Sequence, residues 1–296
     1  MHASVSSAIA DTADRSSDIR ALIGARRTYN RLDWWQPEDW LDSDVWTLAG
    51  ADGALLIMPT DIDEVQSLSE THASVAWLRW CAVADGRSAS GVMRSLFAQA
   101  LPRLRERGVA SVWAIADATD WIVPYLADAG FARADRMLTY QIGLAATDHW
   151  NAPPVSVRPI DRAQPDELKR VIALDELVFD EPWRYGWLLQ RAYDQCQVFT
   201  VAMSGTDMLG YACAVCDGER GHIVRLAVTP TQRGRGLGTA LLKQVADEVQ
   251  ALGARVLSLN TQQSNDASQR LYARLGFHRL IEQPFVLRLA LDRAVS

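Results

Sequence analysis

The sequence predicts an α/β protein, of the mixed α+β kind, with two tandem domains of similar architecture. Three observations lead to this prediction. Residues 222–253 have the pattern of a strand, a glycine-rich loop and a helix, and residues 254–277 that of a second strand, loop and short helix. Residues 77–99 repeat the order of the first of these segments, as expected of a tandem repeat.

Size and composition are those of a globular protein with one large domain or two ordinary ones. The chain has 296 residues, of which 49% are hydrophobic and 22% charged. No apolar run is long enough to cross a bilayer, and residues 1–19 lack the pattern of a signal peptide. We therefore expect a flexible N-terminus, a cytoplasmic protein and no membrane partner. The net charge of −6 argues against nucleic-acid binding, and nothing in the sequence indicates an oligomeric state.

The cysteines do not predict a metal site. Cys213 and Cys216 form a C-x-x-C, but no second such pair follows to complete four ligands. On a strand this odd spacing directs the two thiols to opposite faces. We interpret these cysteines as structural and expect no metal.

The first strand and helix surround the glycine loop. Residues 222–228, "HIVRLAV", are short, apolar and β-branched, which predicts a strand that ends at Thr229 and Pro230. Apolar residues then recur at helical spacing, with Gly253 in the position of a helix C-cap. These residues are Leu237, Leu241, Val245, Val249 and Leu252.

The loop itself, "QRGRGLG" at 232–238, lies where the helix begins. The first turn of a helix has N–H groups without intrahelical partners, so an anion such as a phosphate or pyrophosphate fits there. The loop has neither the Walker lysine nor the G-x-G-x-x-G spacing of dinucleotide sites. The surrounding basic residues support an anionic ligand, although a solvated basic face is the alternative. They are Arg220, Arg225, Arg233, Arg235 and Lys243.

The short helix that ends near residue 277 has two faces. Asn265 is a good N-cap, and Gly276 is a good C-cap. One face is predicted to be a buried stripe of Ala267, Leu271 and Leu275. The other face carries polar groups that are either solvent-exposed or line a site, namely Asn265, Ser268 and Tyr272.

Together, "LAVTPTQRGRGLGTALL" and "LNTQQSNDASQRLYARLGF" resemble the acyl-CoA-binding core of the GNAT superfamily of N-acyltransferases. The first matches the family motif R/Q-x-x-G-x-G/A at Arg233, Gly236 and Gly238. The second matches N-x-x-(A/S)-x-x-L-Y-x-x-x-G-F at Asn265, Ser268, Leu271, Tyr272, Gly276 and Phe277. The resemblance implies two GNAT-like domains, each with a mixed, mostly antiparallel, twisted sheet flanked by helices. The two strands and turn expected over 198–216 suit that fold.

The resemblance also implies acetyl-CoA as cosubstrate and a role for each matching residue. The segment of Leu226, Ala227 and Val228 should bind the pantetheine arm and acetyl group through its backbone. Asn265 and Ser268 should line the cofactor channel. The CoA pyrophosphate should contact the N–H groups of Arg233, Gly234, Arg235, Gly236, Leu237, Gly238 and Thr239.

Proton transfer needs an acid and a base. The resemblance implies that Tyr272 protonates the departing thiolate, and a phenol of ordinary pKa about 10 stays protonated at neutral pH. Many family members that acetylate protein N-termini have a glutamate where Asn260 stands here, and Arg225 stands where others often have an acid. His222 and Glu219 are the remaining candidates for the base, although a lone histidine is more often structural.

The first repeat has lost this chemistry. Aligned without gaps, it matches Arg79 to Arg225 and Gly130-Phe131 to Gly276-Phe277. The functional positions differ between the repeats. Where the second repeat has Gly236, Gly238, Asn265 and Tyr272, the first has Ser90, Val92, Thr119 and Leu126, in the same order. We predict a degenerate domain over 20–146 that binds CoA weakly or not at all, a linker over 147–155 and a catalytic domain over 156–296. The fold then tolerates the loss of the glycines, so the ligand explains Gly234, Gly236 and Gly238 better than the fold does.

Two further features concern partners. The early tryptophans Trp34, Trp35, Trp40 and Trp46 are interpreted as packing residues, with a partner platform as the alternative. Residues 174–196 correspond to the acceptor side in GNAT folds, and their F-x-x-P-W resembles ribosomal-protein N-terminal acetyltransferases. Acids in this segment either attract a cationic amine or cap and solvate a helix, and we favour the second. They are Asp175, Glu176, Asp180 and Glu181.

The sequence therefore supports an N-acetyltransferase with direct transfer to a primary amine of a small molecule or a peptide N-terminus. The alternative is a CoA-binding regulatory or interaction protein without transfer activity, motivated by Asn260 and the degenerate repeat. Retention of Asn265 and Tyr272 argues against that alternative. A third possibility is acetylation of an amino-sugar or small-thiol conjugate, because mycothiol synthases share the tandem layout.

Overall fold

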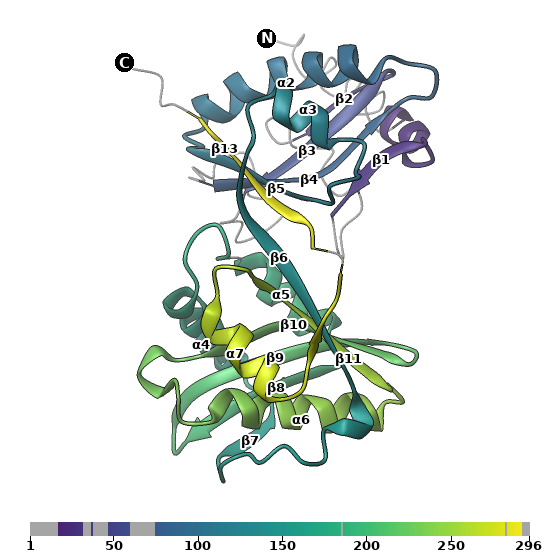
Figure 1. Cartoon of the computed structure of the whole chain (residues 1–296). Helices are drawn as coiled ribbons and strands as arrows, with labels where there is room; N and C mark the ends of the chain where they lie inside the picture. The colour runs from purple at the N-terminus through teal and green to yellow at the C-terminus, as the bar shows by residue number, and fades with distance from the viewer. Residues whose placement is uncertain are drawn as a thin grey trace. The chain divides into compact units, whose positions relative to one another are not determined.

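The computed structural model describes residues 17–31, 37, 47–59, 75–184, 186–281 and 283–291 (Figure 1). These residues form two compact units. The first holds the described residues up to Ala134 together with Phe285–Leu291, and the second spans Asp135–Pro284. Each unit is a mixed sheet flanked by helices, which confirms the predicted fold class. The four tryptophans Trp34, Trp35, Trp40 and Trp46 lie outside the described residues.

The sheet of the first unit has the strand order β2-β3-β4-β5-β13, with β1 also paired to β4. Its strands are β1 Arg27–Asn30, β2 Thr47–Gly50, β3 Gly53–Pro59, β4 Val75–Val83, β5 Ser111–Ala116 and β13 Phe285–Ala290. The helices α2 (Ala89–Glu106) and α3 (Val123–Asp128) follow β4 and β5. The pair β4–β5 is parallel, and the other pairs are antiparallel.

The sheet of the second unit has the order β6-β11-β10-β9-β8-β7, with β12 paired to β6. Its strands are β6 Ala132–Gly143, β7 Ser156–Pro159, β8 Val198–Ser204, β9 Asp207–Asp217, β10 Arg220–Val228, β11 Val256–Gln262 and β12 His278–Arg279. Its helices are α4 Pro165–Val178, α5 Gly186–Gln195, α6 Leu237–Ala251 and α7 Asp266–Arg274. Only the β10–β11 pair is parallel among the described pairs of this sheet.

The segments predicted around the glycine loop are confirmed. The strand, helix and second strand are β10, α6 and β11, and the caps at Asn265, Gly253 and Gly276 lie where expected. The side chains of Leu241, Val245 and Val249 are buried, as the helical spacing predicted. Leu252 is 54% exposed because it lies at the end of α6, past the last buried turn.

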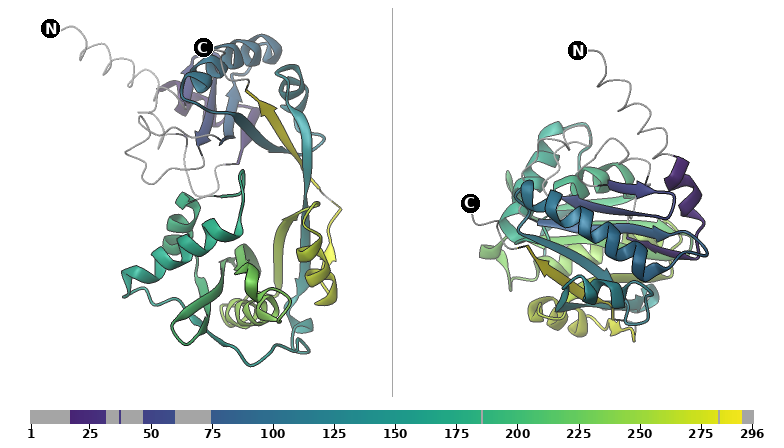
Figure 2. Two further views of the ribbon diagram at one scale, coloured as in Figure 1. Left: turned by 90° about the vertical axis from the view of Figure 1, so that its left-hand side faces the viewer. Right: turned by 90° about the horizontal axis from the view of Figure 1, so that it is seen from above.

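Helices cover both faces of the second sheet (Figure 2). A Cβ built on Gly221 of β10 would contact Val249 of α6, so Gly221 faces α6. Arg225 of β10 contacts Asp175 of α4, so this residue faces the other side. The face toward α6 and α7 carries the main hydrophobic core of the unit.

The two repeats exchange their last strands. In sequence, β6 follows the glycine and phenylalanine that end the first repeat, yet it pairs antiparallel with β11 of the second unit. In the same way β13 follows the second repeat and pairs antiparallel with β5 of the first unit. The units therefore differ from the predicted domains, because residues 135–146 and 285–291 complete the sheet of the opposite repeat.

The segment predicted as a linker is packed into the second unit. Trp150 is buried, donates a hydrogen bond from Nε1 to the Leu275 carbonyl at 2.8 Å, and stacks on Phe277 with ring centroids 5.7 Å apart. The predicted linker over 147–155 therefore also contributes Trp150 to the hydrophobic core of the second unit.

Candidate active site

An opening between β10 and β11 lies at the centre of the second sheet. The two strands pair in parallel from Arg220 and Val256 to Ile223 and Leu259, and within the described chain their pairing ends there. The other edge of β10 stays paired with β9 as far as Val228, with a bulge between Ile223 and Arg225. We call the unpaired edge over residues 224–228 the β10–β11 opening.

The backbone of Leu226 and Val228 points into this opening. The Thr229 N–H donates to the Leu209 carbonyl at 2.9 Å, so Thr229 points toward the β9 side. The Ala227 carbonyl oxygen also lies on that side, 2.6 Å from where a Cβ of Gly210 would be. Because successive residues of a strand direct their backbone polar groups to opposite edges, those of Leu226 and Val228 face the opening.

The glycine loop leads from this opening to the start of α6. Gly234 has φ 77° and Gly236 has φ 83°, in the left-handed region that favours glycine. Gly236 caps α6, and no side chain of the described residues caps this helix start. A Cβ on Gly234 would meet no described atom within 4 Å, so its surroundings are open. An exposed loop with free space at a helix N-terminus can accept a phosphate.

Packing explains two of the loop glycines as well as a ligand does. A Cβ on Gly236 would lie 2.8 Å from ring carbons of Pro153, and one on Gly238 would lie 3.1 Å from Cδ2 of Leu271. The expectation that the ligand rather than the fold explains these glycines is therefore wrong at Gly236 and incomplete at Gly238. The open surroundings of Gly234 leave that expectation intact for this position.

The predicted cluster of basic residues is smaller than the sequence indicated. Arg225 is buried in an ion pair with Asp175, and Lys243 forms an ion pair with Asp247 along α6. Arg220 begins β10, at the end of the strand remote from the loop. Arg233 and Arg235 remain exposed on the loop itself.

Tyr272 is buried in the hydrophobic core on the α7 side of the sheet. It is 5% exposed, and its ring centroid lies 5.6 Å from that of Tyr140 and 5.8 Å from that of Phe277. Burial raises the pKa of Tyr272 from 10.0 to about 12, although a hydrogen bond with the Ser268 side chain lowers it. The phenol is therefore in its protonated, proton-donating form at neutral pH.

Asn265 and Ser268 hold the helix that carries Tyr272. The Asn265 Oδ1 accepts a hydrogen bond from the Ser268 N–H at 3.1 Å, as an N-cap does. The predicted buried stripe on α7 is wrong at Ala267, which is exposed. Leu275 and Tyr272 are the buried residues there, because α7 packs by its C-terminal half.

His222 lies on the opposite face of the sheet from Tyr272. Its Nδ1 lies 2.9 Å from the Ser258 Oγ, which lies 3.2 Å from the Gly221 carbonyl oxygen. The donor and acceptor of the His222–Ser258 contact depend on the imidazole tautomer: when the Ser258 hydroxyl donates to the Gly221 carbonyl, the His222 Nδ1–H donates to Ser258. In a neutral imidazole this arrangement assigns the lone pair to Nε2.

The structure does not bring Glu219 to the opening. Glu219 lies in the turn that joins β9 to β10, and its exposed carboxylate forms an ion pair with Arg255 at 3.0 Å. Asn260 lies on β11 just past the last paired residue, where its Oδ1 accepts from the Thr139 hydroxyl at 2.9 Å. Of the two predicted bases, His222 is nearer to the opening along β10.

The acids of the acceptor-side segment differ in burial. Asp175 is 1% exposed, and its carboxylate accepts hydrogen bonds of 2.9 Å from both Nε and Nη2 of Arg225. The prediction that these acids cap and solvate a helix is therefore wrong for Asp175, which the sequence could not pair with a residue fifty positions away. The other three acids, Glu176, Asp180 and Glu181, are exposed.

In the first unit, a strand of the chain itself fills the corresponding opening. The parallel pairing of β4 with β5 ends at Trp77 and Trp113, as that of β10 with β11 ends at Ile223 and Leu259. Beyond this point β1 pairs with β4 over residues 80–83. Because β3 pairs with the opposite edge of β4 along both stretches, β1 lies on the same edge as β5.

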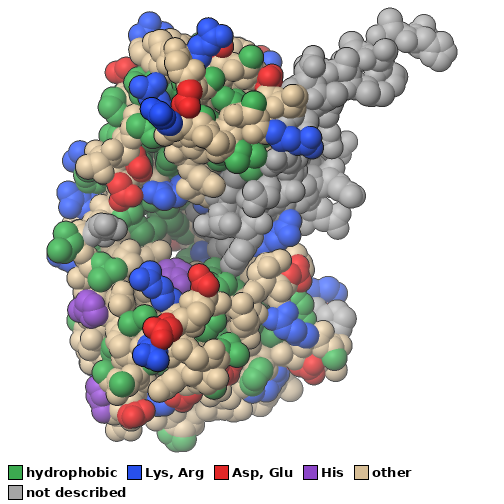
Figure 3. Space-filling view, turned by 90° about the vertical axis from the view of Figure 1, so that its right-hand side faces the viewer, with side chains coloured by type: hydrophobic (Ala, Val, Ile, Leu, Met, Phe, Trp, Pro, Cys, Tyr) green, Lys and Arg blue, Asp and Glu red, His purple; other side chains and the backbone are tan. Residues whose placement is uncertain are grey.

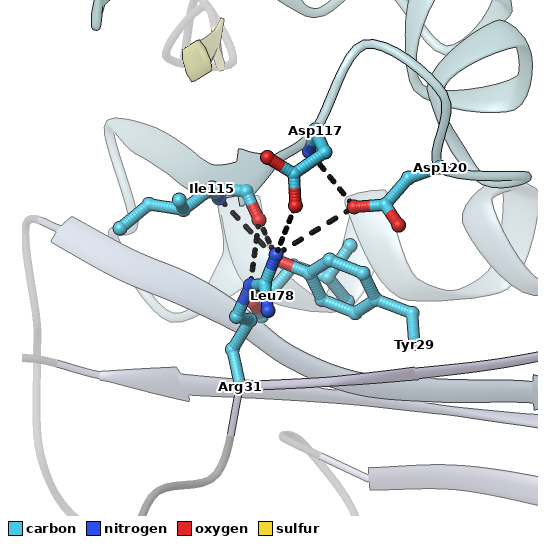
Figure 4. A network of polar contacts seen from close by, with 6 residues as sticks. All are labelled: Tyr29, Arg31, Leu78, Ile115, Asp117 and Asp120. Atoms are coloured by element: carbon cyan, nitrogen blue, oxygen red, sulfur yellow. Dashed lines mark hydrogen bonds and ion pairs between the residues drawn. The ribbon is translucent and has the colours of Figure 1, made fainter. Parts of the chain in front are cut away.

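Tyr29 of β1 joins the two strands that diverge (Figure 4). Its hydroxyl donates to the Ile115 carbonyl of β5 at 2.9 Å and lies 3.4 Å from the Leu78 carbonyl of β4. Arg31 donates from Nε to the same Ile115 carbonyl at 3.2 Å and forms an ion pair with Asp117 at 3.3 Å. Tyr29 is 4% exposed, and burial raises its pKa. Sequence reasoning missed this short strand.

The start of α2 also differs from that of α6. The Ser88 side chain caps α2 and accepts from the Gly91 N–H at 3.5 Å, so one of the orphan donors is satisfied within the chain. Val92, which aligns with Gly238, packs over Gly53, where a Cβ would lie 2.5 Å from its Cγ1. Ser88 thus stands at the position that aligns with the open Gly234, whereas Val92 packs on β3.

The surface carries charges of both signs, and Figure 3 shows acidic and basic side chains interspersed over one face. No described helix is both long and apolar enough to span a membrane. Among the described residues, no group of three or more His, Cys, Asp or Glu side chains is arranged to hold a metal ion.

Comparison with known proteins agrees with this geometry. Residues 166–277 match the model of the Acetyltransferase (GNAT) family. The chain is similar to N-alpha-acetyltransferase 30 of Saccharomyces cerevisiae, with 26% identity over 133 residues, which are 42% of this chain and 76% of that protein.

Two solved structures show the same fold. A tandem GNAT protein from the clavulanic acid biosynthesis pathway matches with a TM-score of 0.58 and 17% identity, over 97% of this chain and 96% of that one. A GCN5-related N-acetyltransferase from Sphaerobacter thermophilus matches with a TM-score of 0.55 and 16% identity, over 82% and 78% of the two chains.

Proposed function

We propose that the chain is a GNAT acyltransferase that transfers an acetyl group from acetyl-CoA directly to a primary amine, because residues 166–277 match the Acetyltransferase (GNAT) family model. The acceptor is a small molecule or a peptide N-terminus, as the N-alpha-acetyltransferase relative suggests. The observation that carries this proposal is the β10–β11 opening, which has a polar backbone edge, an adjoining helix N-terminus and a buried tyrosine.

The residues around the opening fit acetyl-CoA. The backbone of Leu226 and Val228, with Ala227 between them, would hydrogen-bond the pantetheine amides much as another strand would. The pyrophosphate would lie against the N–H groups of residues 233–239, with Arg233 and Arg235 adding positive charge. Asn265 and Ser268 would support this channel by holding α7 and the Tyr272 hydroxyl in place.

The acid and base would act from opposite faces of the sheet. Tyr272, on the α7 face, would give its proton to the thiolate as the thioester bond breaks. His222, on the α4 face, would take the proton of the amine as its nitrogen forms the new amide bond, directly or through a water. In the tautomer in which Nδ1–H donates to Ser258, Nε2 would be the accepting atom.

A transfer assay tests this proposal against its alternative. The purified chain is mixed with acetyl-CoA and with a panel of a peptide with a free α-amino group, a polyamine and an amino sugar, and thiol release is measured. We expect acceptor-dependent release with at least one member. CoA binding without any such release would favour the alternative, a CoA-binding regulatory or interaction protein.

The proposal places one cofactor site in each chain. In the first unit, β1 pairs with the edge of β4 that corresponds to the opening, over residues 80–83, and the Arg31 N–H donates to the Arg79 carbonyl at 2.7 Å. The chain's own strand thus takes the edge that the pantetheine arm needs. In addition, the Ser88 side chain accepts from the Gly91 N–H at the start of α2, so this donor would not be available to a pyrophosphate. We therefore expect the first unit to bind no CoA.

A further inference from the structure

We propose that Arg225 is a positioning residue that fixes the acceptor side of the active site, an inference that rests on the proposed function. Arg225 lies on β10 beside the bulge, next to Leu226, whose backbone faces the opening. It belongs to the α4 face of the sheet, from which an amine would approach His222. Its guanidinium is 8% exposed, so it acts inside the protein and not by contact with solvent.

The guanidinium joins three elements of the second unit. On one side it donates two hydrogen bonds of 2.9 Å to Asp175 of α4. On another, its Nη2 donates to the backbone carbonyl of Trp183 at 2.6 Å. Its Cζ also lies 3.6 Å from the ring centroid of Phe179, in a cation–π contact. Strand β10, helix α4 and the segment of residues 179–183 are therefore held by one side chain.

The segment of residues 179–183 lies where it can shape acceptor binding. It follows α4, carries the F-x-x-P-W sequence and reaches β10 at Arg225, next to Leu226, whose backbone faces the opening. In the proposed function, an amine would approach His222 from the α4 face, where Arg225 contacts this segment. The position of Trp183, and with it the width of the approach, depends on the hydrogen bond that Arg225 donates.

Only an arginine can make all of these contacts at once. The planar guanidinium has donors in a fixed fork, so it can pair with a carboxylate in a bidentate manner and still donate to a carbonyl. A lysine would keep the charge beside Asp175, and so would not leave a buried carboxylate alone. It would lose the fork geometry and the donation to Trp183. Arg225→Lys therefore tests positioning without removing the charge.

The chain offers a matched control. Arg158 of β7 pairs with Glu167 of α4, donating from Nη1 to Oε2 at 3.1 Å, and so ties the same helix to a different strand. Arg158→Lys changes an arginine–carboxylate pair of the same unit away from residues 179–183. It controls for a general loosening of α4.

Two readouts are needed, and the first requires no ligand. Hydrogen exchange is measured at the amides of Phe179 and Trp183, which donate to the carbonyls of Asp175 and Asp180. We expect Arg225→Lys to speed exchange at these amides by about tenfold, and Arg158→Lys to leave it unchanged. The second readout is the KM for the peptide with a free α-amino group and the Kd for CoA. Arg225→Lys should raise this KM by about tenfold and leave the Kd within about twofold.

The outcomes distinguish a failure of the positioning role from a failure of the proposed function. Unchanged exchange and unchanged peptide KM in Arg225→Lys would overturn the positioning role, as would equal effects of Arg158→Lys. A Kd for CoA that rises in step with the KM would also overturn it, because Arg225 would then act on the cofactor strand. If the unaltered chain acetylates no acceptor, the proposed function fails in its own assay, and the positioning role fails with it.

Discussion

The Nδ1 atom of His222 lies 2.9 Å from the Ser258 Oγ, across the last paired rows of β10 and β11. This contact orients an imidazole beside the opening, whereas Glu219 is engaged with Arg255 in an exposed turn. We predict that His222→Gln lowers kcat by about 100-fold or more, and that Glu219→Gln leaves kcat nearly unchanged. Steady-state rates with a saturating acceptor measure both. A large fall in kcat for Glu219→Gln with little change for His222→Gln would assign the base to Glu219.

Tyr272 supplies the second proton transfer. Tyr272→Phe keeps the ring that packs on Tyr140 and Phe277 and removes only the hydroxyl. We expect kcat to fall by about 100-fold or more while the CoA Kd stays within about twofold. Tyr140→Phe, which removes a neighbouring hydroxyl, is the control and should turn over normally. If Tyr272→Phe turns over as well as this control, the acid lies elsewhere.

The dependence of kcat on pH in the alkaline range follows from the same tyrosine. Burial raises its pKa from 10.0 to about 12, so the folded protein holds the proton more tightly than the unfolded chain does. The Tyr272 hydroxyl is therefore fully protonated, and able to donate, below the ordinary pKa of about 10, and it loses its proton as pH rises through about 12. We expect kcat to show no loss from this group up to about pH 10. A decline in kcat centred well below pH 10, absent from Tyr272→Phe, would contradict the raised pKa.

The loop glycines can be separated by two substitutions. Gly234 and Gly236 both have positive φ, so an alanine costs about 1–2 kcal/mol of backbone strain at either position. At Gly236 the new Cβ also meets Pro153 at 2.8 Å, whereas Gly234 is open. Urea unfolding should therefore show a larger loss of free energy for Gly236→Ala. Equal losses for the two variants would mean that Pro153 moves away without cost.

Local sequence patterns were enough to predict the elements around the site. The glycine loop, the Asn265 cap and the period of α6 are each set within about 15 residues, where spacing and capping rules apply. These features depend on neighbours in sequence, and so they can be found in one chain. The cofactor contacts of Leu226 and Val228 come from the family resemblance and stay a prediction.

Long-range pairings were beyond the reach of those rules. The pair of Arg225 and Asp175 joins residues fifty positions apart, and a single sequence does not say which buried acid a buried arginine will find. The exchange of β6 and β13 could not be predicted either, because the sequence of each strand fits an antiparallel pairing in its own repeat or in the other one. Strand β1, with four residues, is too short to show a period, although it decides what the first unit can bind.

The number of CoA molecules that one chain binds tests the central claim most directly. Isothermal titration of the intact chain with CoA should give one site. The double variant Arg233→Ala/Arg235→Ala should weaken this site, and Arg87→Ala, which alters the aligned arginine paired with Asp52 in the first unit, should not. One site per chain with this pattern is the result that we predict. Two sites, no binding, or a site that depends on Arg87 would contradict the assignment of the cofactor to the β10–β11 opening.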